Sequence, residues 1–458
     1  MTATVSDNGS RPRSRPRPAM ERPAGDPLGI AVIGAGYWGP NIIRNALALE
    51  ETELKWVCDR DVVRARCVVG AQSAIGVTAE LDDVLDDESV EAVVIATPPG
   101  THAELALRCI AAGRHILIEK PLADSYEAGL SIVQAADAEG LVLHCDHTFC
   151  YTPAVQAIRD LVVRGELGTA LYYDSVRVNL GLVQQEVDVF WDLAPHDISI
   201  LDFILGDGRE PVTVAAQGAD PLGVGHACVG YLALAFDDGL LAHCHLNWLS
   251  PTKIRTTIVG GSERMVVWND LLPAQRVSVY ESGVDLSDGD LTRGEQRRRQ
   301  VSYRIGSMVA PPLREREALR GVLEDWAGAI RTRRRPMTDG LAGLRVLRVL
   351  EAAQASLAHG GGPVPLRALV MVCWLRPSPS AACRSWTSPR STRPCTTRSW
   401  PPGHVSCARA RSPAVPRWRS SSESSRPRAR WRTAWQWPAA RTLSFLPCGR
   451  SASGPAIA

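Results

Sequence analysis

Lysine is nearly absent from this 458-residue chain, whose 51 basic residues comprise three lysines and 48 arginines. Of the three, Lys120 directly follows a buried apolar run, where a compact ammonium that can exchange a proton explains the exception. The chain also lacks an apolar run long enough to cross a bilayer, and the seven cysteines before residue 370 form no CxxC pair. These absences argue against a membrane protein and a disulfide scaffold, and they favour reduced cysteines in a cytoplasmic protein.

Acidic residues are scarce at the carboxyl end, where residues 371–458 hold 15 arginines and one acid, Glu423. Residues 27–370 hold 31 basic and 45 acidic residues, which argues against a nucleic-acid partner for the folded part. The stretch 369–458 contains seven tryptophans and five cysteines without any apolar period, which predicts a non-globular tail produced by a frameshift in GC-rich DNA. A basic, aromatic RNA-binding arm is the alternative. Residues 1–26 are rich in proline and arginine and predict a disordered leader.

An apolar run at 28–33 leads directly into Gly34-Ala-Gly36-Tyr37-Trp38-Gly39, and a helical stretch to about Leu49 follows. GxGxxG between a strand and a helix is the dinucleotide-binding pattern, in which backbone and helix N-terminus face a pyrophosphate. The next strand, 52–58, ends at Asp59, where an acid accepts hydrogen bonds from the adenosine ribose and favours NAD. Arg60 would instead pair with a 2′-phosphate and favour NADP.

Strands and helices alternate over residues 27–147, which predicts an NAD(P)-binding Rossmann domain with a doubly wound parallel sheet. One strand exits through Thr97-Pro98 towards His102, and the strand at 115–118 exits at Glu119-Lys120-Pro121. Polar groups at the carboxyl ends of such strands face the ligand crevice. An ordinary surface ion pair is the alternative for Lys120. The cofactor-binding residues expected from these motifs are Gly34, Gly36, Tyr37, Trp38, Gly39, Asp59, Arg60, Thr97, Pro98, His102, Glu119 and Lys120.

Residues 148–368 show longer strands with two-residue alternation, and helices at about 314–333 and 339–358 follow. This pattern predicts a substrate-binding α+β domain with a large, mainly antiparallel sheet and returning C-terminal helices. The expected strands are 171–179, 212–217, 227–236, 240–248, 254–259, 265–268 and 277–280.

A second polar cluster, Trp191-Asp192-Leu-Ala-Pro195-His196, opens a helix that ends at Gly206. Because proline is tolerated in the first turn, Asp192 is expected at the cap and His196 one turn later on the same side. An aspartate that orients an imidazole makes a general base, although Asp192 would also serve as a simple cap.

Histidines at 144, 147, 243 and 245 lack a recognisable third ligand, so hydrogen-bonded sheet histidines are favoured over a metal site, and no metal is expected. Only His147 is kept as a pocket residue, because it ends the last parallel strand.

In this order and spacing, the glycine motif, Ala96-Thr97-Pro98, Glu119-Lys120-Pro121 and the Asp192-xxx-His196 pair resemble the glucose–fructose oxidoreductase and inositol dehydrogenase (Gfo/Idh/MocA) family over residues 28–366. The segments 147–153 and 178–197 look most like the branch that oxidises C3 of UDP-N-acetylglucosaminuronate and related nucleotide sugars. The resemblance implies that Lys120 touches substrate and nicotinamide, and that His196 is the general base with Asp192 behind it. It also implies that Arg177 and Asn179 line the sugar pocket.

The implied protein is an NAD-dependent dehydrogenase of sugar hydroxyl groups that forms a homo-oligomer, a dimer or tetramer. Oxidising an alcohol requires a hydride acceptor, a base and a positive charge near the developing alkoxide, and nicotinamide, His196 and Lys120 supply one each. The alternatives are a cyclitol or sugar-phosphate dehydrogenase, a ketosugar reductase, or a non-catalytic nucleotide-sensing regulator, because pocket loops rather than motifs set the substrate.

Overall fold

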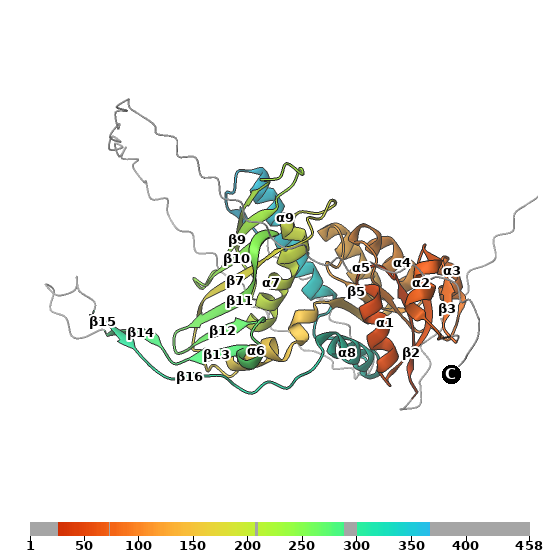
Figure 1. Ribbon diagram of the computed structural model, residues 1–458, viewed down its shortest axis with the longest axis horizontal. Helices are drawn as coiled ribbons and strands as arrows, with labels where there is room; N and C mark the ends of the chain where they lie inside the picture. Colours follow the sequence, from red (N-terminus) through yellow and green to blue (C-terminus); the bar gives the residue numbers. More distant parts are fainter. Residues whose placement is uncertain (1–25, 73, 207–208, 288–299, 367–458) are drawn as a thin grey trace, which may run out of the picture. The chain divides into compact units, whose positions relative to one another are not determined.

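A six-stranded parallel sheet forms the amino-terminal part of the computed structural model, which describes residues 26–72, 74–206, 209–287 and 300–366 (Figure 1). The strand order is β3-β2-β1-β4-β5-β6, so the chain reverses its winding direction between β1 and β4. Ligands of such sheets bind outside the carboxyl ends of the strands at this reversal. The strands are β1 (Leu28–Ile33), β2 (Thr52–Cys58), β3 (Gly76–Thr78), β4 (Ala92–Ile95), β5 (His115–Glu119) and β6 (Leu143–Asp146).

Helices connect the parallel strands, and the central strands are apolar because the sheet is covered on both faces. Every residue of β1 and of β4 is buried. The connecting elements are α1 (Gly39–Ala48), α2 (Val62–Val69), α3 (Leu81–Asp86), η1 (Pro99–Thr101), α4 (His102–Ala111) and α5 (Tyr126–Glu139). This arrangement confirms the predicted doubly wound sheet.

A second, nine-stranded sheet has the order β16-β13-β12-β11-β7-β10-β9-β8-β17. Its neighbours pair antiparallel except β7 and β10, which are parallel, so the sheet is mainly antiparallel as predicted. A separate ribbon joins β14 (Gly283–Ser287) and β15 (Gln300–Arg304). The nine strands are β7 (Ala170–Leu180), β8 (Thr213–Ala219), β9 (Val229–Ala235), β10 (Leu241–Asn247), β11 (Leu249–Gly261), β12 (Met265–Asn269), β13 (Val277–Tyr280), β16 (Met308–Val309) and β17 (Val364–Pro365).

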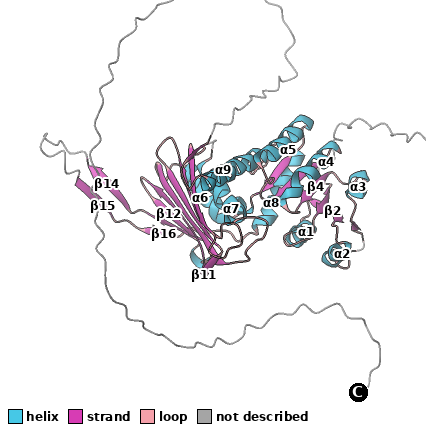
Figure 2. Cartoon of the chain, turned by 90° about the horizontal axis from the view of Figure 1, so that it is seen from above, coloured by secondary structure: helices cyan, strands magenta, loops and turns pink. Residues whose placement is uncertain are grey.

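Helices cover one face of this second sheet (Figure 2). Helix α7 (Val189–Leu205) packs on β9 and β10, and α9 (Gly340–Ala358) packs on β8 and also on α5 and β6. Helix α8 (Ala318–Thr332) returns to α1, and η2 (Thr148–Tyr151) and α6 (Pro153–Val163) follow the last parallel strand. Side chains on the other face remain accessible, for example Tyr231, which is 44% exposed.

The start of α7 differs from the prediction. The helix begins at Val189, and Asp188 caps it by accepting hydrogen bonds from the backbone N–H groups of Phe190 and Trp191 at 3.0 and 2.9 Å. Pro195 therefore lies inside the helix and Asp192 is not the cap. A proline in a helix interior costs roughly 3 kcal/mol, and burial of the helix's many apolar side chains, at about 1.5–3 kcal/mol each, offsets it.

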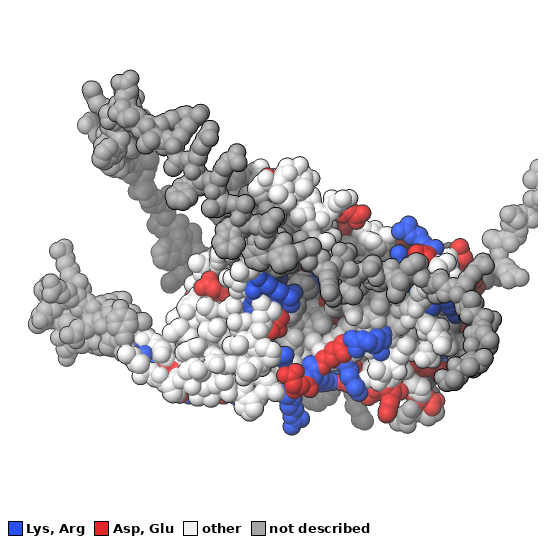
Figure 3. All heavy atoms as spheres, viewed as in Figure 1, with Lys and Arg blue, Asp and Glu red and all other residues white. Residues whose placement is uncertain are grey.

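The predicted tail and all but the last residue of the predicted leader lie outside the described residues. No helix in the described part of the chain is both long and apolar enough to span a membrane. On the face drawn in Figure 3, acidic and basic side chains of the described residues lie interspersed. That face presents no block of one charge sign among the residues described there.

Candidate active site

The glycine loop between β1 and α1 leaves room at one position and packs tightly at two others. A Cβ at Gly34, whose φ is +100°, would lie 2.6 Å from the carbonyl oxygen of Ala96, and a Cβ at Gly39 would collide with the carbonyl oxygen of Gly34. A Cβ at Gly36 would meet no heavy atom within 4 Å. No described side chain caps the first turn of α1, and that turn contains no acid. The loop and the positive end of the helix dipole therefore fit the pyrophosphate of a dinucleotide.

Three donors fix the carboxylate of Asp59 at the end of β2. It accepts hydrogen bonds from the backbone N–H groups of Ala35 at 2.6 Å and Asp61 at 2.8 Å, and from Nη2 of Arg64 at 2.7 Å. Burial opposes the charged form, but the three donors outweigh it and hold the pKa of Asp59 below its ordinary value. An anion beside the glycine loop suits a ribose diol and repels a 2′-phosphate. The predicted rival, Arg60, is exposed, and the ion pair comes from Arg64, which the sequence did not single out.

His102 ties the exit of β4 to the exit of β5. Its Nε2 lies 2.8 Å from the carbonyl oxygen of Thr97, and its Nδ1 lies 3.0 Å from that of Pro121. The ring is fully buried, and burial lowers its pKa. His102 therefore positions the loop that carries Lys120. Pro98 precedes the 3₁₀ turn η1, and Tyr37 is 91% exposed. Cofactor contacts of these residues stay predictions.

Lys120 reaches from the end of β5 to α7. Its Nζ donates a hydrogen bond to the backbone oxygen of Asp192 at 3.1 Å and lies 3.8 Å from Oδ1 of the same residue. The other carboxylate oxygen, Oδ2, accepts a hydrogen bond from Nε1 of Trp248 at 2.9 Å. Trp248, which the sequence did not single out, thus fixes the carboxylate that accompanies the lysine.

His196 lies one helical turn after Asp192, and among the described contacts no hydrogen bond joins the two side chains. Within the described residues, the carboxylate of Asp192 has Trp248 and Lys120 as its polar partners. The imidazole instead meets the ring of Phe149 edge-on, with 5.0 Å between the ring centroids. Burial first, and then the positive charges of Lys120 and other nearby cations, lower the pKa of His196 well below its ordinary value. The imidazole is therefore neutral at physiological pH.

Arg177 is buried on the second sheet, where it lines a small hollow together with Phe149 and Arg255. Its Nε and Nη2 donate to the two carboxylate oxygens of Asp197 at 2.8 and 3.0 Å, and Ser175 donates to Oδ1 at 2.7 Å. The guanidinium also lies 4.6 Å from the ring centre of Phe149. Arg177 therefore supports the aromatic ring next to His196, so its predicted direct contact with sugar stays a prediction.

Two further predicted pocket residues differ in their surroundings. His147 is buried, and neither ring nitrogen has a hydrogen-bond partner among the described residues. Burial above all lowers its pKa to about 3. Asn179 is half-buried on β7. Its amide nitrogen packs close to Gly181, since a Cβ added there would lie 2.8 Å from it. His147 thus offers polar atoms close to the strand ends, and Asn179 lies near the end of its strand.

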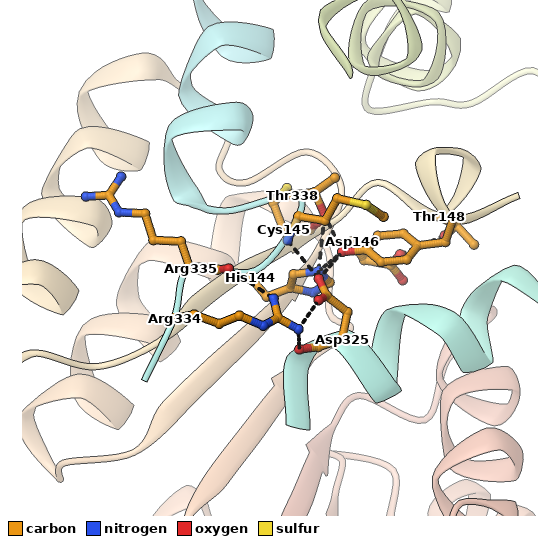
Figure 4. Close-up of polar contacts among 10 residues, drawn as sticks. His144, Cys145, Asp146, Thr148, Asp325, Arg334, Arg335 and Thr338 are labelled. Atoms are coloured by element: carbon orange, nitrogen blue, oxygen red, sulfur yellow. Dashed lines mark hydrogen bonds and ion pairs between the residues drawn. The ribbon is translucent and has the colours of Figure 1, made fainter. Parts of the chain in front are cut away.

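A hydrogen-bond network joins β6 to the segment between α8 and α9 (Figure 4). His144 Nε2 lies 2.6 Å from the hydroxyl of Tyr151 and 3.1 Å from that of Thr338. Tyr151 donates to Asp325 at 2.7 Å, and Asp325 also pairs with Arg334 at 2.6 Å. His144 is thus used in a structural network. No group of three metal-binding side chains occurs in the described ranges.

The rings of His243 and His245 both stack on the ring of Tyr231. Their place on the accessible face of the second sheet separates them from Lys120 and His196.

Two family models match the chain. One, described as an oxidoreductase family with an NAD-binding Rossmann fold, matches residues 28–147, and the GFO/IDH/MocA C-terminal domain matches residues 155–266. The chain is 32% identical over 269 residues to 4-carboxy-2-hydroxymuconate-6-semialdehyde dehydrogenase of Sphingobium sp., covering 56% of this chain and 85% of that protein. It is 27% identical over 323 residues to UDP-N-acetylglucosamine 3-dehydrogenase of Acidithiobacillus ferrooxidans, covering 69% and 93%.

Among solved structures, GenD2 from gentamicin A biosynthesis in complex with NAD is 26% identical, with a TM-score of 0.62. The alignment covers 77% of this chain and 99% of that chain.

Proposed function

Because the chain belongs to the GFO/IDH/MocA oxidoreductase family, whose cofactor is NAD, we propose that it oxidises a hydroxyl group, at C3, of a nucleotide sugar. A relative named as a UDP-N-acetylglucosamine 3-dehydrogenase, covered over 93% of its length, supports this substrate class. The observation that carries the proposal is the approach of Lys120, at the carboxyl end of β5, to the turn of α7 that bears Asp192 and His196.

The side chains divide the work of alcohol oxidation. Bound NAD supplies the hydride acceptor. The neutral imidazole of His196 takes the hydroxyl proton, and the ammonium of Lys120 stabilises the negative charge that develops on the same oxygen. Asp192 and Trp248 hold Lys120 in place through the hydrogen bonds described above. Phe149, backed by Arg177, fixes the plane of the imidazole.

The test is a panel of UDP-N-acetylglucosamine, its uronate and myo-inositol, with NAD reduction followed by absorbance. Lys120→Met and His196→Ala should each lower turnover by about 100-fold or more, since a positioned acid or base contributes roughly 10²–10⁴ in rate. Affinity for NAD should change far less, because both residues are separate from the glycine loop.

Lys55→Met is the matched control. It removes another of the three lysines, one whose ammonium pairs with Glu53 on β2 at 2.6 Å. Its turnover should match that of the wild type. Normal turnover in both site variants would remove the catalytic assignment. Binding of NAD without turnover of any compound would favour the nucleotide-sensing regulator.

We also propose that two or four copies associate through the accessible face of the second sheet. That face includes Tyr231 and Leu241, whose side chains are large, apolar in part and exposed. Exposed apolar patches on sheets mark association surfaces. Light scattering of the purified chain should give a dimer or tetramer, and a monomer at working concentration would refute the proposal.

A further inference from the structure

Two carboxyl groups face one another at the carboxyl ends of β5 and β6, next to Lys120. Glu119 and Asp146 are direct partners in the register of these parallel strands. Asp146 is fully buried. Oε2 of Glu119 and Oδ2 of Asp146 are buried atoms with no hydrogen-bond donor among the described residues. Two ionised carboxylates offer only acceptors to each other, so a proton on one of them is what would join them.

The surroundings are unequal for the two carboxyl groups. Thr148 donates a hydrogen bond from Oγ1 to Oδ1 of Asp146 at 2.7 Å. This donor favours the ionised form of Asp146 and leaves the proton on Glu119. Burial first, and then the charge of Asp146, raise the pKa of Glu119 well above its ordinary value.

Among the described residues, one cation and two thiols interact electrostatically with the pair, and the imidazole of His147, whose pKa burial lowers to about 3, adjoins Asp146 in the chain. Lys120 follows Glu119 in the chain and is the cation that interacts with both carboxyl groups. Cys145 and Cys150 are buried thiols close to Asp146, and burial raises the pKa of both. The thiols therefore stay neutral at physiological pH. The charge opposite Lys120 is then set by how many protons the carboxyl pair holds.

We propose that Glu119 and Asp146 hold one proton between them and present Lys120 with a single negative charge. The pair is a positioning element that holds the side chain of Lys120 near Asp192. The existence of the shared proton follows from the two carboxyl groups alone, and only its effect on turnover rests on the proposed function.

The shared proton is tested without substrate, by denaturant unfolding of the full chain between pH 5 and 7. The folded protein keeps a proton that the unfolded chain releases above about pH 4.3, so the wild type loses stability as pH rises, relative to a variant that cannot ionise there. The ratio of the wild-type folding constant to that of Glu119→Gln should therefore fall about tenfold for each unit of rising pH. Asp146→Asn should give the same difference and serves if the first variant does not fold.

Glu104→Gln is the control, because Glu104 is an exposed acid on α4. Its curve should run parallel to that of the wild type. Wild-type and Glu119→Gln curves that also run parallel would overturn the shared proton, whatever the protein catalyses.

The effect on Lys120 is tested by the pH profile of turnover. Each single amide variant keeps one negative charge in the pair, whereas the double variant Glu119→Gln/Asp146→Asn has none. In both single variants the basic limb of the profile should keep its position on the pH axis. In the double variant it should move to lower pH, and this comparison does not depend on the absolute turnover rate. Single variants that shift as far as the double variant would show two charges and overturn the proposal.

Discussion

Replacing Asp197 by asparagine should destabilise the fold strongly, because the change strands a buried charge. Arg177 and Asp197 are 5% and 0% exposed, and two hydrogen bonds of 2.8 and 3.0 Å join them. Asparagine has the same shape but no charge, and its amide turns one donor towards the guanidinium. Removing one partner of a buried ion pair costs about 3–5 kcal/mol in unfolding free energy. We expect a loss in that range, since Ser175 also loses an ionised acceptor.

A second arginine–carboxylate pair in the same chain provides the comparison. Arg44 binds both carboxylate oxygens of Glu317 at 3.0 and 2.5 Å, with side chains that are 58% and 45% exposed. This pair and the pair of Arg177 with Asp197 form the same type of contact, and they differ mainly in how far their side chains are buried. Glu317→Gln should therefore change stability little, because water solvates the remaining charge.

Denaturant unfolding of the three proteins, followed by fluorescence, measures both effects. The double variant Arg177→Met/Asp197→Leu should recover most of the loss, because apolar replacements of a buried pair are often neutral or stabilising. Equal losses in Asp197→Asn and Glu317→Gln would refute the argument from burial. Failure of the charge-free variant to exceed Asp197→Asn would show that the hydrogen-bond geometry, rather than the stranded charge, matters.

Two other predictions concern the cofactor and pH. Asp59→Ser should narrow the preference for NAD over NADP, measured as the ratio of the two dissociation constants, because the carboxylate that repels a 2′-phosphate is gone; an unchanged ratio would assign the preference to another residue. Burial lowers the pKa of His144 to about 4, whereas an unfolded histidine titrates near 6.5, so the unfolded chain takes up the proton first as pH falls. The contribution of His144 to the free energy of unfolding is therefore complete above pH 6.5. It falls by up to about 3 kcal/mol as the pH drops towards 4. His144→Gln should show a smaller loss of unfolding free energy between pH 7 and 5 than the wild type, and equal losses would contradict the depressed pKa.

The parallel sheet could be predicted because each buried strand is recognisable from its own short stretch of sequence. A strand covered on both faces is an uninterrupted run of apolar side chains, as in β1 and β4, and the glycine motif fixes where the first helix starts. The short strand β3 has only three residues, and such a segment has no period to recognise.

The site was harder to predict because its contacts come from tertiary structure. Asp197 lies 20 residues after Arg177, and nothing in that spacing indicates a pair that forms only when α7 packs on the sheet. Likewise, Trp248 and Asp192 meet across 56 residues. The cap of α7 was missed for a different reason, since two aspartates, Asp188 and Asp192, precede a proline and the rule against internal proline favoured the later one.

A backbone carbonyl of α7 also binds Lys120. Pro195 has no N–H to donate to the carbonyl of Trp191, four residues earlier. One residue further along, the carbonyl oxygen of Asp192 accepts the ammonium of Lys120 at 3.1 Å, closer than the carboxylate oxygen at 3.8 Å. A carbonyl oxygen has two lone pairs, so it accepts from Lys120 without giving up a helical N–H. The position of the ammonium therefore depends on the path of α7 at least as much as on the side chain of Asp192.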